Sequence, residues 1–384
     1  MITKVFASTS GSFLFCLEEI KRRLERELPQ FDFLIFSIHP HFPEEDIIPL
    51  IEHVFQTENY LGFSSIASFW NNKIVEKGVV CTAVKFTRNG KVNFYVDSID
   101  STSKQIDQLA TYLNSNKRAF HFALFNYFEE VGFLLDQLSA QITYSPIDNI
   151  IGGLCSTTNH HPTTIYAKKA IIRRGFALLS FWNCQVETGI SLGFKPYGIT
   201  YEVAKGEKNI IYQVDDSRPF SPLIKRFFRG IENPTVEYLW YAPIYLLDEE
   251  KDYLATLRTF KELHEDGIEF FGPVKKGDKF KLSFATPQDL LREDERIAWE
   301  VKKRIRRPEM VFNVSCIARQ YVLEDRRQEE VEIYTNVFNT YLFGFFSFGE
   351  IGPDIYRRRL KLFNETSLIV AIREKDRNEG RDKD

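Results

Sequence analysis

The sequence predicts a mixed α/β fold in which duplicated strand-helix-strand units form central sheets that helices cover. Three observations support this fold class. The 384-residue chain is 43% hydrophobic and holds 35 phenylalanines, which is enough apolar side chain for a large core. Three stretches show the same order of strand, amphipathic helix, glycine and strand. In each stretch about 30 residues separate the first strand from the glycine, and near-constant spacing with little identity is typical of duplicated units.

The first unit opens with an apolar strand at residues 32–37. The helix that follows is amphipathic and places these apolar residues on one face: Ile47, Ile48, Ile51, Val54 and Phe55. The unit then reaches Gly62, within residues 60–65, and ends with a strand at residues 78–86.

The second and third units repeat this order. The second has a strand at 120–125, a helix with Val131, Leu134, Leu135, Leu138 and Ile142 facing inward, a glycine segment at 151–156 and a strand at 175–181. The third has a strand at 310–316, a helix carrying Val331, Tyr334 and Phe338, a glycine segment at 342–349 and a strand at 366–372. We expect these strands to assemble into one or two central sheets with the helices outside.

Gly62, Gly152 and Gly344 mark the same point of the three units. A residue without Cβ at the start of a strand permits a positive φ or a close approach of two backbones, and an ordinary turn glycine is the simpler alternative. The aromatic run at residues 343–348 would promote aggregation if it were exposed, so it is either a core strand or an interface. We favour the core.

The chain is long enough for two domains, and its turn signals change after residue 193. We therefore predict an N-terminal part at residues 1–194, a C-terminal part at 195–372 and a charged, disordered tail at 373–384. Within the C-terminal part we expect strands at 236–245 and 280–284 and a helix at 287–307 that ends before Pro308.

Composition excludes several classes of protein. Lys and Arg total 50 against 53 Asp and Glu, so the net charge of −3 predicts neither a nucleic-acid partner nor a membrane partner. The basic run at residues 302–307 is typical of a solvated helix end. Five cysteines without paired spacing, and a first segment without an apolar signal region, favour reduced thiols and a cytoplasmic location.

No motif for phosphate, zinc, dinucleotide or nucleophile-elbow chemistry occurs, so we expect no cofactor, no metal and no catalytic residue. A cysteine-dependent enzyme stays open as an alternative. Its nucleophile would be Cys155 or Cys316, with His160 or His161 as the group that activates a thiol. For both cysteines, a small buried core residue is the simpler interpretation.

Segments in both halves of the chain resemble the FIST (F-box and intracellular signal transduction) sensory domains. The N-terminal segments are residues 32–37, 62–65 and 73–80, and the C-terminal segments are residues 196–198, 274–278, 315–319, 349–353 and 363–368. The most specific is Gly-Glu-Ile-Gly-Pro at 349–353, followed by Asn-Glu-Thr at 364–366.

The resemblance implies a signal-input module that binds a small molecule such as an amino acid and signals through an output protein, here expected in trans. The chain departs from the family pattern at four places. Phe63 replaces a cysteine, Ala67-Ser68 replaces an acidic residue, and Phe363 and Glu365 replace a histidine and a glutamine beside Asn364.

Two charged residues in the matched segments suit an amino-acid ligand. Arg319 follows a buried strand, and its planar fork fits a carboxylate; a surface salt bridge is the alternative. Glu350 lies between two glycines and could hold the ammonium group; an ordinary turn acid is the alternative. The further candidate binding residues are Asn364, Ser64, Ser65, Cys155, Ser156 and Cys316.

We therefore expect an amino-acid sensor whose pocket lies at the junction of its two parts. The other classes that remain open are the cysteine enzyme and an adaptor that recruits a signalling partner through an aromatic surface.

Overall fold

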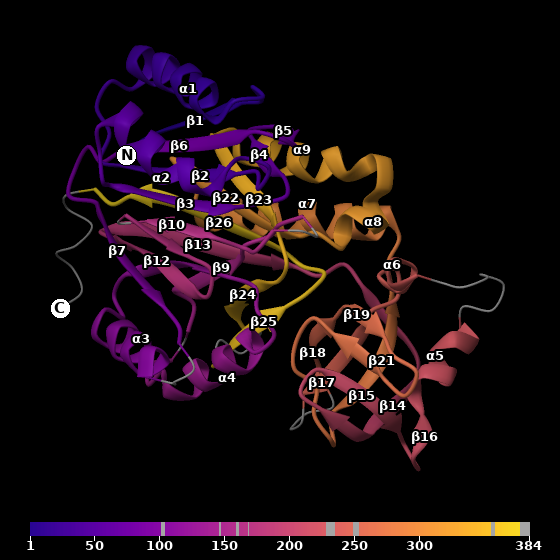
Figure 1. The fold of residues 1–384 in the computed structure, drawn as a ribbon. Coiled ribbons are helices and arrows are strands. Elements are labelled where there is room, and N and C mark those ends of the chain that lie inside the picture. The colour runs from indigo at the N-terminus through magenta and orange to yellow at the C-terminus, as the bar shows by residue number, and fades with distance from the viewer. Residues whose placement is uncertain are drawn as a thin grey trace.

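The computed structural model describes residues 1–100, 104–145, 147–158, 161–167, 169–227, 235–248, 253–354 and 358–376. Helices pack on the outer faces of mixed β-sheets, which confirms the predicted α/β class (Figure 1). The described strands of the main body form three six-stranded sheets rather than the expected one or two. A fourth sheet, of eight strands, lies to one side of this body (Figure 1).

Each repeat unit forms the centre of one six-stranded sheet. The first unit consists of β2 (Phe33–Ile38), α2 (Glu44–Phe55), β3 (Tyr60–Ser64) and β6 (Val79–Lys85). β2 pairs with β3 in parallel and with β6 in the antiparallel sense. Every residue of β2 is buried, as expected for a strand whose sheet is covered on both faces.

The other two units have the same pairing. The second consists of β8 (Phe120–Phe125), α4 (Val131–Gln141), β9 (Ile150–Leu154) and β12 (Gly175–Trp182). The third consists of β22 (Met310–Cys316), α8 (Arg319–Leu323), the 3₁₀ helix η1 (Glu324–Arg326), α9 (Arg327–Phe338), β23 (Leu342–Ser347) and β26 (Ser367–Glu374). The repeat seen in the sequence is therefore a structural repeat.

A strand and a helix precede each unit, and the strand adds to one edge of its sheet. They are β1 (Ile2–Ser8) with α1 (Phe13–Glu27), β7 (Lys91–Ser98) with α3 (Lys104–Ser115), and β13 (Cys184–Ser191) with α7 (Pro287–Arg304). The three strands pair with β6, β12 and β26 in turn.

Hairpins are exchanged between the units. β4 (Ser68–Trp70) and β5 (Lys73–Val75) leave the first unit and extend the third sheet through β23. β10 (Ile165–Ala167) and β11 (Ala170–Ile172) leave the second unit and extend the first sheet. β24 (Glu350–Pro353) and β25 (Leu360–Phe363) leave the third unit and extend the second sheet. Because no unit completes its own sheet, the three depend on one another.

The eight-stranded sheet belongs to an inserted domain, which the chain forms between β13 and α7. Its elements are β14 (Lys195–Glu207), β15 (Ile210–Val214), β16 (Arg218–Pro219), α5 (Phe220–Phe227), α6 (Val236–Leu239), β17 (Ile244–Asp248), β18 (Tyr253–Arg258), β19 (Phe260–Leu263), β20 (Ile268–Phe270) and β21 (Lys279–Phe284). The predicted strand at 236–245 is wrong for its first half, which forms α6. Pro243 lies between this helix and β17. Proline has no backbone N–H to donate to the preceding turn, so the helix cannot extend through it.

The charged tail begins later than the sequence suggests. Arg373 and Glu374 are the last residues of β26, and Glu374 is buried. Residues 377–384, the rest of the predicted tail, lie outside the described part of the chain.

Phenylalanines from all three units meet between the sheets of the main body. The rings of Phe122 and Phe312 stack with centroids 4.7 Å apart, and those of Phe63 and Phe345 meet edge to face at 4.7 Å. Phe343, Phe345 and Phe346 are fully buried, so the prediction that the aromatic run is a core strand is confirmed.

Gly152 and Gly344 allow close backbone approach, Gly62 faces the side chain of Tyr166, and none of the three forms a left-handed turn. Each lies inside the second parallel strand, facing Phe36, Ala123 or Asn313 of the first, and none has a positive φ. A Cβ atom on Gly152 would lie 1.7 Å from the carbonyl oxygen of Ala123. A side chain at this point would therefore push the parallel strands apart.

Candidate functional site

The parallel strands of the three units end at a common junction, and the predicted serines gather there. Ser64 Oγ accepts a hydrogen bond from the backbone N–H of Thr164 at 2.9 Å. Ser65 Oγ donates to the carbonyl of Ala67 at 2.7 Å, and Ser156 Oγ donates to that of Phe346. All three serines are buried, so they tie the units together beneath the surface.

A pocket of about 430 Å³ opens above this junction, between the first and third units. It is lined by His39, Ile66, Ala67, Glu76, Lys77, Ile317, Gln320, Tyr321 and Arg327. We call it the interunit pocket. It lies at the carboxyl ends of β2, β3 and β22, where open α/β sheets bind their ligands. Sequence reasoning named none of these residues as ligand contacts.

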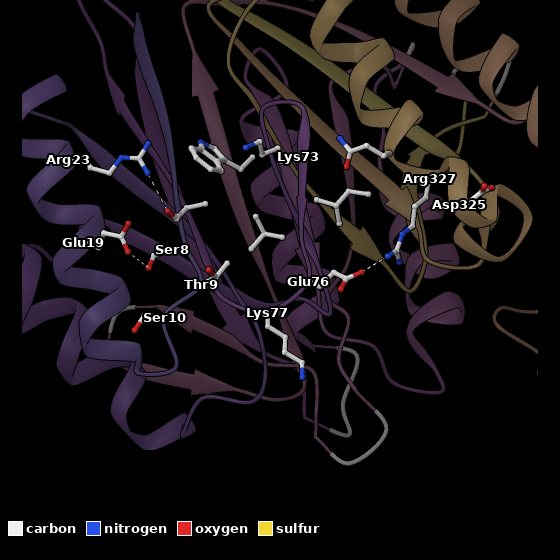
Figure 2. Close-up of a pocket in the computed structure, with 15 residues that line it drawn as sticks. Ser8, Thr9, Ser10, Glu19, Arg23, Lys73, Glu76, Lys77, Asp325 and Arg327 are labelled. Atoms are coloured by element: carbon white, nitrogen blue, oxygen red, sulfur yellow. Dashed lines mark hydrogen bonds and ion pairs between the residues drawn. The ribbon is translucent and has the colours of Figure 1, made fainter.

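A wider groove of about 930 Å³ runs beside the interunit pocket and shares Glu76, Lys77 and Arg327 with it. Figure 2 shows Ser8 and Glu19 on one side of this groove, and Arg327 and Asp325 on the other. The ion pair between Arg327 and Glu76 joins α9 to the loop after β5. Both residues line the groove as well as the interunit pocket, so the pair lies where these two meet.

Arg319 does not form a surface salt bridge. Its side chain is fully buried, and its Nη2 donates to Asp294 Oδ2 at 2.6 Å. Its Nε lies 3.6 Å from Glu330 Oε1. Asp294 and Glu330, on α7 and α9, were both missed from the sequence, although Asp294 is an acid on the apolar face of its helix, between Leu290 and Ile297.

Glu350 is fully buried as well, as the first residue of β24. Ser347 Oγ donates to its Oε1, and Thr366 Oγ1 donates to its Oε2 at 2.7 Å. It is therefore not an ordinary exposed turn acid, and both of its oxygens already hold protein donors.

Glu365 is a further buried acid, which sequence analysis named only as a departure from the family pattern. Its φ of 58° is unusual for a residue with a side chain, and such backbone strain is concentrated at functional sites. Its Oε1 accepts a hydrogen bond from Thr259 Oγ1 of the inserted domain at 2.9 Å. Its place beside Asn364 in the matched motif was the available signal.

Arg319 faces Asp294, Glu330 and Glu365, and Glu365 faces Glu350. We define these residues, with the buried chain neighbour of Glu365, as one charged cluster: Asp294, Arg319, Glu330, Glu350, Asn364 and Glu365. Several of its buried polar atoms have no hydrogen-bond partner in the described part of the chain. They are Arg319 Nε and Nη1, both carboxylate oxygens of Glu330, Glu365 Oε2, and Asn364 Oδ1 and Nδ2. Buried polar groups in folded proteins are normally hydrogen-bonded to protein or to ordered water, so we take this cluster as the candidate site.

The cluster also holds acids that can exchange protons near neutral pH. Burial raises the pKa of Asp294 to about 7, although the charge of Arg319 opposes the rise. Burial likewise raises the pKa of Glu350 and that of Glu365 to about 8. Such values arise because burial removes a carboxyl group from water, which disfavours its charged form.

The two candidate cysteines are buried within the same junction. Burial raises the pKa of Cys155 and that of Cys316 well above the ordinary value for a thiol. Both therefore remain protonated at neutral pH, which is unfavourable for a nucleophile. His160, one of the suggested activating residues, lies outside the described residues.

A possible metal site lies away from the cluster, on the inserted domain. Among the described side chains, Glu262, His264 and Glu269 place one ligand atom each within 4.8 Å of the others. Lys261 already pairs with Glu269 at 2.6 Å, so a metal ion would compete with an ammonium group there.

Comparisons with known proteins cover most of the chain. The family model described as FIST N domain matches residues 32–217, and the one described as FIST C domain matches residues 225–353. An uncharacterized protein of Aquifex aeolicus (strain VF5) is 32% identical over 262 residues, which cover 64% of this chain and 95% of that protein. In the described part of the chain, no helix has the length and hydropathy needed to cross a membrane.

Proposed function

Because this chain belongs to the FIST family, whose domains are associated with sensory roles in signal transduction, we propose that it senses an amino acid or a related metabolite. One observation carries the proposal: buried donors and acceptors without partners concentrate in the charged cluster, next to an accessible pocket of ligand size. The ligand enters through the interunit pocket, and its charged groups pair with the cluster.

Arg319 binds the carboxylate in this proposal. Its Nη1 has no hydrogen bond and can donate to a ligand carboxylate, whereas Nη2 already donates to Asp294 and Nε faces Glu330. The sequence favoured Glu350 for the ammonium group, but both oxygens of Glu350 already accept hydrogen bonds. We assign the ammonium to Glu365, whose Oε2 lacks a partner, and leave Glu350 as a neighbouring acid.

Helix α8 forms the wall between the pocket and the cluster. Gln320 and Tyr321 line the pocket, whereas Arg319 points into the cluster. The Tyr321 ring also meets that of Trp240 in the inserted domain, with centroids 4.4 Å apart. A ligand that moves α8 would therefore act on the inserted domain. We propose that an output protein supplied in trans reads this change, in the cytoplasm.

A thermal-shift screen of the purified full chain against the twenty amino acids tests the proposal. We expect at least one to raise the melting temperature, since a ligand that binds only the folded state stabilises it. Glu365→Gln keeps the shape of the side chain and should reduce that rise. Arg296→Gln, on the exposed face of α7, is the control and should leave it unchanged. If no amino acid stabilises the chain, the proposal is wrong.

A further inference from the structure

We infer that the ligand is a basic amino acid, which carries a second amine or a guanidinium in addition to its α-ammonium group. This inference rests on the proposed function and specifies its ligand. It follows from the donors and acceptors that the cluster leaves without partners, and from the balance of charge around Arg319.

Acceptors outnumber donors among the unpartnered atoms of the cluster. Arg319 contributes Nη1, whose N–H groups can donate to a ligand carboxylate, while its Nε faces Glu330 Oε1 at 3.6 Å. The amide of Asn364 contributes a donor and an acceptor, so it favours neither a donor-rich nor an acceptor-rich ligand. The remaining atoms are carboxylate oxygens: Oε2 of Glu330, Oε2 of Glu365, and Oε1 of Glu330, which lies 3.6 Å from Arg319 Nε without a hydrogen bond. A ligand rich in N–H donors would satisfy them.

These oxygens belong to two separate elements. Glu330 lies on α9, whereas Glu365 lies in the turn that leads into β26. One α-ammonium can serve one of these carboxylates, and a second cationic group is needed for the other. A diamino acid, or an amino acid with a guanidinium, supplies one carboxylate and two cations, which matches the cluster.

Charge leads to the same conclusion. The cluster contains four carboxyl groups against the single guanidinium of Arg319. Glu365 faces Arg319 from α8, Glu350 from β24 and the Cys316 thiol from β22. Asp294 faces Arg319, Glu330 and the Tyr334 hydroxyl. A neutral zwitterion would add no net charge, whereas a basic ligand compensates one buried carboxylate.

A basic ligand must also displace protons. The raised pKa values of Glu350 and Glu365 mean that these acids hold protons at neutral pH in the free protein. A bound ammonium favours their ionised forms, so binding should release protons into the solvent. A neutral amino acid should release fewer.

Isothermal titration calorimetry of the full chain tests this inference. L-lysine, L-arginine, L-ornithine, L-leucine and L-glutamate are titrated at pH 7.5 in phosphate and in Tris, two buffers that differ in ionisation enthalpy. We expect the basic ligands to bind at least about ten-fold more tightly than leucine, and their apparent enthalpy to depend on the buffer. Glu365→Gln should weaken lysine binding about ten-fold or more and change leucine binding little. Glu300→Gln, an exposed change on α7, is the control.

The outcomes separate the inference from the proposed function. If leucine or glutamate binds as tightly as lysine, the inference is wrong and the amino-acid sensor stands. If lysine binds with unchanged affinity to Glu365→Gln, the assignment to this cluster is wrong. If none of the five binds, the inference is wrong, and the thermal-shift screen of all twenty amino acids decides the proposed function.

Discussion

Replacing Arg319 by methionine should strongly destabilise the fold. The change keeps a long side chain but removes the guanidinium that faces Asp294 at 2.6 Å and Glu330 at 3.6 Å. All three side chains are at most 1% exposed, so water cannot compensate the acids that are left behind. Removing one partner of a buried ion pair typically costs about 3–5 kcal/mol, and we expect a loss in this range at pH 8.

The loss should depend on pH. Because the pKa of Asp294 is about 7 with Arg319 present, this acid is largely protonated at pH 5.5 and needs less compensation there. The destabilisation caused by Arg319→Met should therefore be smaller at pH 5.5 than at pH 8. Urea unfolding followed by circular dichroism at both values measures the difference.

Arg296→Met is the matched control, since it removes a guanidinium from α7 that also faces two acids, Glu293 and Glu300. Its side chain is 52% exposed, and solvent-exposed ion pairs contribute about 0–1 kcal/mol. If Arg319→Met costs no more than Arg296→Met at pH 8, Arg319 does not compensate buried charge, and our account of the cluster is incorrect.

Three further predictions follow from the structure. The free energy of unfolding should fall as pH rises from 6.5 to 8, because Asp294, Glu350 and Glu365 have raised pKa values and the folded state therefore binds more protons in this window; below it the lowered pKa values of His39 and His121 oppose the trend. Glu350→Gln should flatten that fall, and an unchanged slope in urea unfolding would argue against a role for this acid. Gly152→Ala should destabilise by about 1–3 kcal/mol, because its Cβ would meet the Ala123 carbonyl at 1.7 Å. Gly11→Ala, where nothing lies within 4 Å, should change the melting temperature little, and equal effects of the two would contradict the packing argument. Cys155 and Cys316 should resist a thiol reagent at pH 7.5 in the folded chain and react in urea, since both are buried and protonated. Rapid labelling of either one in the native protein, located by mass spectrometry, would instead support the cysteine enzyme.

The local pattern of apolar residues, polar residues and glycines was sufficient to predict much of the fold. The order of strand, helix, glycine and strand recurs at near-constant spacing, and each repeat became the centre of one sheet. The helix expected at 287–307 forms at Pro287–Arg304, because its apolar period and its N-terminal cap are local properties. The aromatic run at 343–348 could be placed in the core because exposing it would be costly.

Part of the candidate site could also be inferred from the sequence. The predicted serines and Arg319 lie at the strand ends, where the order of the repeat units suggested binding residues. The partners of Arg319 could not be inferred in this way. Asp294 is 25 residues away in the chain, and only the packing of α7 on α9 brings the two side chains together. The sequence did hold one usable signal for the site. Asp294 is an acid on the apolar face of α7, and a charge at such a position indicates a buried partner.

The sequence by itself thus determined the repeat units, their strands and helices, and the apolar core, since these depend on the period and spacing of neighbouring residues. Only the tertiary structure decided that the units exchange hairpins, that Arg319 is buried, and that Glu365 reaches Thr259 of the inserted domain. These features join residues distant in the chain. Their free energy comes from desolvation and charge compensation in three dimensions, which no local pattern records.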